Sequence, residues 1–398
     1  MKSKNILISG ASIAGPALAY WLHQYGFDVT VVERAETLRE GGQAVDFRGE
    51  AHLTMLKRMG ILDDIKRHRT PPGPLILLDA HGAEQVRLPA SFTGGEVEIA
   101  RGDLSRLLYE RTRDRVEYIF GDSIASMVET ATGVDVAFEH GAPRSFDLVV
   151  GADGLHSNVR RLAFGDESQY VKSSGYYVAL FSAPNHLGLH AESMLYSEPG
   201  RGMLVYGTRD GEANAMCVFA AEPLDYHRRD VATQKRIVAE AFAGMGWESA
   251  KLVAALPGAR EFYFDTIGLV QMDHYTKGRV ALLGDAGYGA TTGGMGAGMA
   301  MISSYVLAGE LAAAGGDHSV AFPQYEQQIR GYAKACQRVA AGVGPFFAPS
   351  TAKKIQRRGT IYKILASRLF VGVLNRMTTS AANHIKLKHY VGGARTGA

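Results

Sequence analysis

The sequence predicts a mixed α/β fold with a Rossmann-like domain, a second sheet-based domain and a C-terminal helical segment. Two glycine-rich stretches, residues 10–15 and 284–298, each follow a short apolar run and precede a helical pattern. That is the strand–turn–helix order of nucleotide-binding folds. Residues 171–264 are rich in Tyr, Phe and alternating apolar positions and predict a separate sheet. The chain beyond residue 298 has a helical pattern to its end.

Length and composition favour a globular protein of two domains, or of one large domain with a subdomain. The chain has 398 residues, of which 46% are apolar and 21% charged, more than one minimal core needs. Its apolar start imitates a signal peptide, but Gly10, Gly15 and Pro16 interrupt that stretch. No uninterrupted apolar run reaches the roughly 18 residues of a membrane span. Cys217 and Cys336 are too far apart for a close-spaced redox pair, so we expect a reducing, cytoplasmic location.

The first glycine stretch has the steric features of a phosphate-binding turn. Gly10 permits a tight turn, Gly15 lets the following helix pack close to the strand, and the N–H groups of its first turn attract a pyrophosphate. Ser12 stands where a second glycine is usual. Glu33 lies 23 residues after Gly10, where an acid accepts hydrogen bonds from a ribose.

The other elements follow from periodicity and from chain breakers. A helical region over 51–69 stops near Gly60, and Arg101–Arg111 predicts a helix that Asp103 caps. Helices are also predicted at Ile13–Tyr25, Val231–Met245 and Gly298–Ala314, a hairpin at Leu75–Glu98, and strands at Ile6–Ser9, Val29–Val32, Val116–Ile119, Ile124–Val128, Val134–Phe138, Phe146–Gly151 and Arg279–Leu283. We assign residues 1–75, 97–170 and 265–350 to the nucleotide-binding domain, 76–96 and 171–264 to the second domain, and 351–398 to the C-terminal segment.

Charge is distributed unevenly along the chain. Residues 1–326 carry 30 basic and 40 acidic groups, a net charge of −10, whereas the 72 residues after Glu326 hold 13 Lys or Arg and no acid. We expect a basic helix with Ile361–Met377 packed across the two domains. The alternative is an amphipathic helix that lies on an anionic membrane. The apolar positions of that helix are Ile361, Ile364, Leu365, Leu369, Val373 and Met377.

Three motifs in this order resemble the single-component flavoprotein monooxygenases of the aromatic-hydroxylase type. They are the glycine fingerprint, Gly151-Ala152-Asp153-Gly154 with Arg160, and Gly284-Asp285-Ala286. Within that family, Gly41-Gly42, Asp46 and Arg101-Gly102-Asp103-Leu104 are similar to residues of tetracycline-inactivating flavin monooxygenases and hydroxylases of polycyclic natural products. Tyr288 departs from the family's usual His, and the usual proline near Thr291 or Thr292 is missing, which leaves the conformation of this loop open.

The resemblance implies that both glycine stretches bind one FAD. Asp285, an acceptor-only group, can bind a ribityl hydroxyl, and the loop 293–298 offers backbone N–H groups to the flavin ring. Ile124 is implied as a backbone contact to the adenine. The implied contacts are Gly10, Ser12, Ile13, Ala14, Gly15, Glu33, Arg34, Asp46, Arg101, Ile124, Asp153, Asp285, Gly294, Gly296 and Gly298.

The resemblance also implies a reaction. NADPH or NADH reduces FAD, O2 forms a flavin hydroperoxide, and one oxygen atom hydroxylates an aromatic or polycyclic small molecule, tetracycline-like compounds included. Arg201, Met203 and Tyr206 are candidates for the substrate pocket. We assign no catalytic side chain, no metal site and no nucleic-acid partner, because the 13 His are scattered and no metal-ligand spacing occurs.

Two other functions fit the same motifs. One is an FAD-dependent reductase or dehydrogenase acting on a polyprenyl or other apolar substrate. The other is a non-catalytic flavin- or ligand-binding protein, which the Tyr288 departure favours. A flavin halogenase is disfavoured because it needs a tryptophan-rich motif, and the chain has only Trp21 and Trp247.

Overall fold

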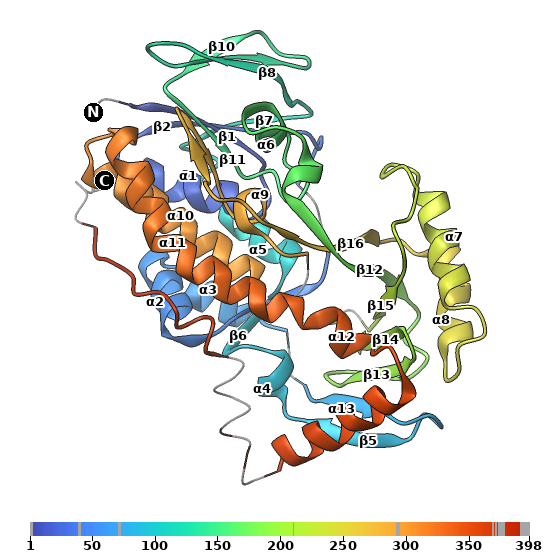
Figure 1. The fold of residues 1–398 in the computed structure, drawn as a ribbon. Coiled ribbons are helices and arrows are strands. Elements are labelled where there is room, and N and C mark those ends of the chain that lie inside the picture. Colours follow the sequence, from blue (N-terminus) through green and yellow to red (C-terminus); the bar gives the residue numbers. More distant parts are fainter. Residues whose placement is uncertain are drawn as a thin grey trace.

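The computed structural model describes most of the chain and places two sheets at different ends of the molecule (Figure 1). A parallel sheet lies with its helices at one end, and a larger, mainly antiparallel sheet lies at the other. The described residues are 3–38, 41–70, 73–209, 211–291, 295–367, 370, 372 and 379–390.

The first sheet has six strands, and its two faces are covered differently. Successive side chains of a strand point to opposite faces. Ile6 and Ile8 therefore pack into the large helical core, whereas Leu7 packs into a separate core beneath a small sheet. One strand at the edge, Thr276–Lys277, pairs antiparallel with its neighbour, and all other neighbouring strands pair in parallel. The strand order is β17 (Thr276–Lys277), β18 (Val280–Leu282), β11 (Leu148–Gly151), β1 (Asn5–Ser9), β2 (Asp28–Glu33) and β7 (Glu117–Phe120).

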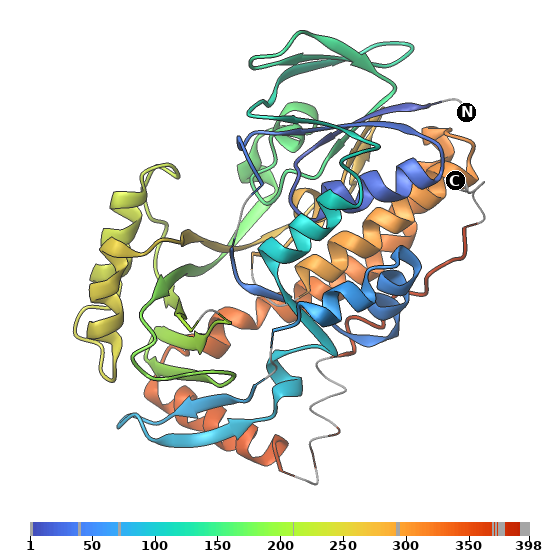
Figure 2. The ribbon, with the colours of Figure 1, turned by 180° about the vertical axis from the view of Figure 1, so that it is seen from behind.

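Long helices cover one face of this sheet, and a three-stranded sheet covers the other (Figures 1 and 2). The helical side is formed by α1 (Ala14–Gln24), α2 (Gly49–Met59), α3 (Leu62–Arg67), α5 (Arg101–Glu110), α10 (Gly296–Ala313) and α11 (His318–Ala341). The opposite side is formed by β8 (Ile124–Glu129), β9 (Val134–Phe138), β10 (Arg144–Phe146) and α6 (Asn158–Ala163).

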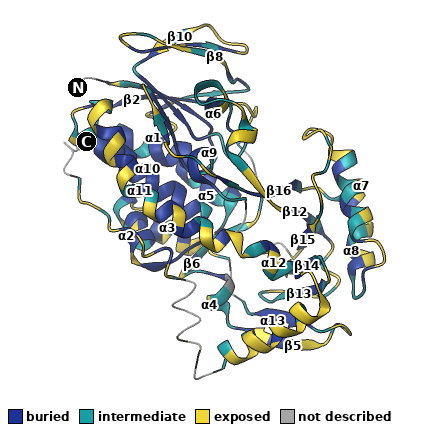
Figure 3. Cartoon of the chain, viewed as in Figure 1, coloured by how far each residue is buried: buried dark blue, intermediate teal, exposed yellow. Residues whose placement is uncertain are grey.

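The second sheet has seven strands and is also covered on both faces. Helices α7 (Val231–Ala241) and α8 (Ser249–Ala255) pack on one face, and α12 (Val343–Phe347) and α13 (Ala352–Leu365) pack on the other. Figure 3 shows α10 almost wholly buried, whereas α7 and α13 expose their outer surfaces. The strand order is β16 (Phe262–Val270), β12 (Val171–Ala183), β15 (Ala213–Ala220), β14 (Arg201–Gly207), β13 (Ser193–Glu198), β4 (Leu75–Leu78) and β5 (Glu84–Leu88).

Several short elements lie outside the sheets described above. A two-stranded ribbon pairs Asp46 with Glu98 in antiparallel register. The ribbon is β3 (Ala44–Phe47) and β6 (Val97–Ala100), and the remaining elements are α4 (Ala90–Thr93), α9 (Asp285–Tyr288), η1 (Glu167–Gln169) and η2 (Leu256–Gly258).

Three local predictions need correction. Asp103 does not cap α5, because the helix begins at Arg101 after Ala100, and no side chain caps it. The hairpin ends at Leu88 rather than Glu98, since the later residues form α4 and β6, which pairs with β3. The helix after the flavin loop begins at Gly296, two residues earlier than predicted, so the last residues of the predicted loop belong to its first turn.

The C-terminal prediction also needs correction. Residues 381–390 contain no helix. Ile361 and Ile364 are 41% and 53% exposed, so they are not packed across the two domains. Leu369, Val373 and Met377 lie outside the described residues. No helix among the described residues is long and apolar enough to cross a bilayer.

Candidate functional site

The turn after β1 is built by close packing of backbone. Gly10 has φ +108°, and a Cβ on it would lie 2.5 Å from the carbonyl oxygen of Ala152. A Cβ on Gly15 would lie 1.9 Å from the carbonyl oxygen of Gly10. Ile13 precedes the first residue of α1. The turn therefore touches the Asp153 motif, and the N–H groups at the start of α1 lie beside both.

Glu33 organises this turn from the end of β2. Its two carboxylate oxygens accept hydrogen bonds from the backbone N–H groups of Ala11, at 2.7 Å, and Ala35, at 2.9 Å. Each carboxylate oxygen has further lone-pair capacity, so Glu33 can hold the turn and accept from a ribose hydroxyl as well. Arg34, next to it, is exposed.

Arg101 brings the first glycine turn together with the segment after β2. Its Nη2 donates to Ser12 Oγ at 2.7 Å, and a Cβ on Gly42 would lie 3.7 Å from its side chain. Asp46 lies four residues after Gly42 in the sequence, but its buried carboxylate pairs with Arg48 and not with Arg101. Arg101 thus joins two segments that the sequence had suggested separately.

Asp285 is the most unusual group in this region. Oδ1 of its carboxylate is buried and has no hydrogen-bond partner among the described residues, whereas the residue as a whole is partly exposed. Burial raises the pKa of this carboxyl to about 6, and the charge of Arg101 opposes that rise. A buried acceptor without a donor is costly, so the site fits a ligand that brings one.

The third motif lies directly against the first. Cβ positions built on Gly284 would lie 3.5 Å from Ala14 Cβ and 3.6 Å from Ala300 Cβ, and Ser304 Oγ donates to the carbonyl oxygen of Ala14 at 3.1 Å. A Cβ on Gly296 would lie 3.9 Å from Asp285 Oδ1. The first turn of α10, whose N–H groups have no helical partner, therefore adjoins the unpartnered oxygen.

These features fit FAD. The ribityl chain would supply the hydroxyl donors that Asp285 lacks, and the starts of α1 and α10 would offer N–H donors to the pyrophosphate and to the flavin ring. Gly294 lies outside the described residues.

The Asp153 motif holds the start of α6 and contacts the third motif through Arg160. Asp153 accepts from Ser157 Oγ and, at 3.0 Å, from the N–H of Val159, which ties down the start of α6. Arg160, completely buried, donates from Nη1 to the carbonyl oxygen of Ala286 at 2.8 Å and so reaches the third motif. The carbonyl of Ile124 accepts from Asn158 Nδ2 at 2.6 Å.

Two further residues of this region, Tyr288 and His52, are buried, and the sequence did not single out His52. Tyr288, in place of the family's usual His, is fully buried and bonds through its hydroxyl to Tyr325 at 2.7 Å, so it is part of the core. His52 lies against Gly298, where a Cβ would be 2.2 Å from its ring, and its Nε2 bonds to Tyr332 at 2.6 Å. Burial lowers the pKa of His52 to about 4. Its Nδ1 accepts from the backbone N–H of Arg48 at 3.1 Å, but Tyr332 and Gly298 lie far along the chain, so no local pattern marks His52 as part of this region.

The three pocket candidates do not share a face of β14. Arg201 donates to backbone carbonyls of Ala241 and Ala243, and Met203 is in the core beneath α7 and α8. Strand side chains alternate, so Tyr206 points to the opposite face, where Asn214 bonds to it. Burial raises the pKa of Tyr206, and the charge of Glu98, on the ribbon beside Asp46, acts on it.

Comparison with known proteins agrees with the geometry. The FAD-binding domain family matches residues 3–340. A flavin-dependent monooxygenase of Legionella longbeachae is 36% identical over 353 residues, which cover 87% of this chain and 90% of the relative. The crystal structure of the tetracycline destructase Tet(55) is 35% identical with a TM-score of 0.83, covering 98% of this chain and 99% of the other. HpxO of Klebsiella pneumoniae, solved with FAD and uric acid, is 22% identical with a TM-score of 0.74, covering 95% and 97%, and shares the fold.

Proposed function

Because the chain belongs to the FAD-binding domain family and is an FAD-dependent monooxygenase, we propose that it hydroxylates a polycyclic aromatic small molecule of the tetracycline-like class. The observation that supports the substrate class is the likeness to Tet(55) over nearly the whole of both chains. As in the family, NADPH or NADH is the reductant and O2 the source of the inserted oxygen.

FAD supplies the redox and oxygen chemistry, and side chains of this protein hold it. In our proposal Asp285 accepts a ribityl hydroxyl, Glu33 a ribose hydroxyl, and Arg101 fixes the turn at Ser12. The first turn of α10 directs N–H groups at the ring, where negative charge develops on reduction.

The substrate is proposed to lie against the face of β14 and β15 that carries Tyr206 and Asn214. The charges of Glu98 and Glu261 act on Tyr206, so this wall is polar and acidic. Glu98 has a pKa raised to about 7 by burial and by the nearby charge of Asp46. Such a wall suits a substrate with several hydroxyl or amino donors, as polycyclic phenols have.

The domain assignment remains part of the proposal. We propose that the segments around the six-stranded sheet bind FAD, that 76–96 and 171–264 form the substrate domain, and that 351–398 is an appended segment. We also propose a cytoplasmic location, because Cys217 and Cys336 are free thiols.

A substrate panel tests this function. Purified enzyme is incubated with NADPH, O2 and a set of tetracyclines and other polycyclic phenols. We expect at least one compound to accelerate NADPH oxidation and to gain one oxygen atom by mass spectrometry. NADPH oxidation without oxygenated product from any of them would overturn the substrate class but not FAD binding.

Association with an anionic membrane through α13 is a second candidate. Ile361 and Ile364 are exposed next to basic residues of an acid-free tail, the composition of an interfacial helix. Full-length protein should sediment with anionic liposomes at low salt, and Ile361→Ser/Ile364→Ser protein should not. Absence of sedimentation of the full-length protein would remove this candidate.

A further inference from the structure

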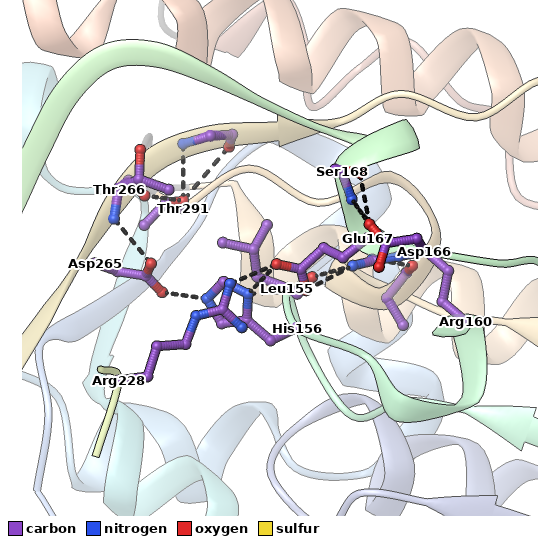
Figure 4. Close-up of polar contacts among 12 residues, drawn as sticks. Leu155, His156, Arg160, Asp166, Glu167, Ser168, Arg228, Asp265, Thr266 and Thr291 are labelled. Carbon is purple, nitrogen blue, oxygen red and sulfur yellow. Dashed lines mark hydrogen bonds and ion pairs between the residues drawn. The ribbon is translucent and has the colours of Figure 1, made fainter. Parts of the chain in front are cut away.

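A second cluster of ionisable side chains lies outside the FAD contacts, around His156 (Figure 4). His156 lies in the turn between β11 and α6. Its Nδ1 is 3.0 Å from Glu167 Oε1, and its Nε2 is 2.9 Å from Asp265 Oδ2. Both ring nitrogens thus face carboxylates, and only the imidazolium can donate to both.

The two carboxylates come from different parts of the molecule. Glu167 belongs to η1, which follows α6, and it is also bonded by Arg228 and lies 3.4 Å from Arg160 Nη2. Asp265 belongs to β16 of the seven-stranded sheet. His156 therefore links the Asp153–Arg160 turn to the second sheet.

Hydrogen bonds connect Asp265 to residues beside the proposed FAD site. Its Oδ1 accepts from the N–H of Thr266 at 2.8 Å, and its Oδ2 accepts from the hydroxyl of Tyr263 at 3.2 Å. Thr291, at the start of the flavin loop, donates from Oγ1 to the carbonyl oxygen of Thr266 at 2.8 Å. Burial raises the pKa of Tyr263 most, the charge and hydrogen bond of Asp265 raise it further, and the charge of Asp285 adds a smaller rise.

We propose that protonated His156 is a positioning residue that clamps β16 to the Asp153–Arg160 turn and thereby holds Thr291 and Tyr263 in the arrangement that binds FAD. The clamp rests on the FAD site proposed above and adds to it a residue with no implied contact to the cofactor. Loss of the imidazolium leaves Asp265 with two neutral donors and no direct cation, so β16 is held less firmly.

Charge balance sets the pH range in which the clamp operates. Burial by itself lowers the pKa of His156, but its hydrogen bonds to Asp265 and Glu167 outweigh burial and raise it above the usual value. The charge of Arg228 lowers the pKa of His156 and so opposes the rise. The other charged or titratable groups of the cluster interact with the two carboxylates: Arg160 with Glu167, and Tyr226 and Tyr263 with Asp265. A group whose folded pKa is raised stabilises fully below its unfolded pKa, and that contribution is lost as pH rises through the folded pKa.

The test measures FAD affinity by fluorescence from about pH 7 to about pH 9, above the usual His pKa of about 6.5. Asp285, with a pKa of about 6, is already ionised over most of this range. Wild-type affinity should fall as His156 deprotonates. At the lower pH, His156→Gln should bind FAD about 10-fold more weakly than the wild type, the scale of one lost charged hydrogen bond. The affinity of this variant should fall little further as pH rises.

A matched histidine serves as the control. His186 pairs with Glu248 at 3.2 Å on the outer side of the second sheet, so His186→Gln should keep the wild-type affinity and pH profile. A wild-type profile that is flat, or a His156→Gln profile that falls as the wild type does, would overturn the clamp. The wild-type profile needs no variant to fold, and a wild type that binds no FAD at any pH would overturn the proposed function instead.

Discussion

Asp265 is a buried carboxylate and Asp285 has a buried carboxylate oxygen, yet the surroundings of the two groups are opposite. Asp265 accepts from His156, Tyr263 and Thr266. Asp285 has an oxygen with no donor among the described residues, and its pKa is raised by burial. Burying a charge is costly unless it is paired and hydrogen-bonded, so Asp265 is satisfied by the folded chain itself, whereas we propose that a ligand satisfies Asp285. In this proposal the contrast distinguishes a carboxylate that holds the fold from one that holds a cofactor.

Removal of the completed carboxylate should have the largest effect. Asp265→Ala leaves His156 with one carboxylate and frees the Tyr263 hydroxyl, and loss of one partner of a buried pair costs about 3 kcal/mol. We expect this loss in the free energy of unfolding, measured by urea denaturation of the FAD-free protein. Asp225→Ala, which removes an exposed carboxylate of the same region, should change it little. Equal effects of the two variants would show that the Asp265 contacts do not support the fold.

Asp285→Ala should instead act on the cofactor. A hydrogen bond to a charged group is worth ~1.5–3 kcal/mol, which corresponds to a roughly 10- to 100-fold loss of FAD affinity. Asp103→Ala is the control, because Asp103 lies in the same helix as Arg101. Its side chain is partly exposed and forms a long ion pair, at 3.7 Å, with Arg106. If both variants lose FAD equally, Asp285 is not the ribityl acceptor.

Glu33 is an intermediate case, because backbone donors already occupy its oxygens. Glu33→Ala should weaken FAD binding about 10-fold, the lower end of the range for a charged hydrogen bond. Glu36→Ala, an exposed acid near the same strand end, should leave the affinity unchanged. Titration of FAD fluorescence measures both variants, and unchanged affinity in Glu33→Ala would assign Glu33 to the turn alone.

The last effect should have the opposite sign. Because the Asp285 pKa is raised to about 6, the folded state holds its proton to higher pH than the unfolded state, and stability falls as pH rises through that range. Asp285→Asn removes the buried charge, so FAD-free protein at neutral pH should gain about 1–2 kcal/mol. Thermal unfolding at about pH 5 and about pH 7.5 measures the gain, which should shrink at the lower pH. A loss of stability at neutral pH would contradict the contrast drawn above.

Much of the FAD-binding frame could be predicted because its signals are local. Gly10 must be glycine for its positive φ, and the strand–turn–helix order around it is legible as apolar periodicity. The wrong predictions concern boundaries and partners. Asp103 has the composition of a cap, but the helix begins two residues before it. Ile361 and Ile364 have the spacing of a buried face, but both side chains are exposed.

By itself, the sequence determined the kinds of elements, the order of the three motifs and the family they indicate. Tertiary structure alone decided which charges meet. His156 and Asp265 are 109 residues apart, and nothing local to either predicts the pair. Which face of β14 carries Tyr206 likewise depends on the side that α7 and α8 cover, because a period of two marks alternate faces but does not say which helices cover each face. Pairs of side chains far apart in the sequence depend on how whole sheets and helices pack, and no short stretch of the chain determines that packing.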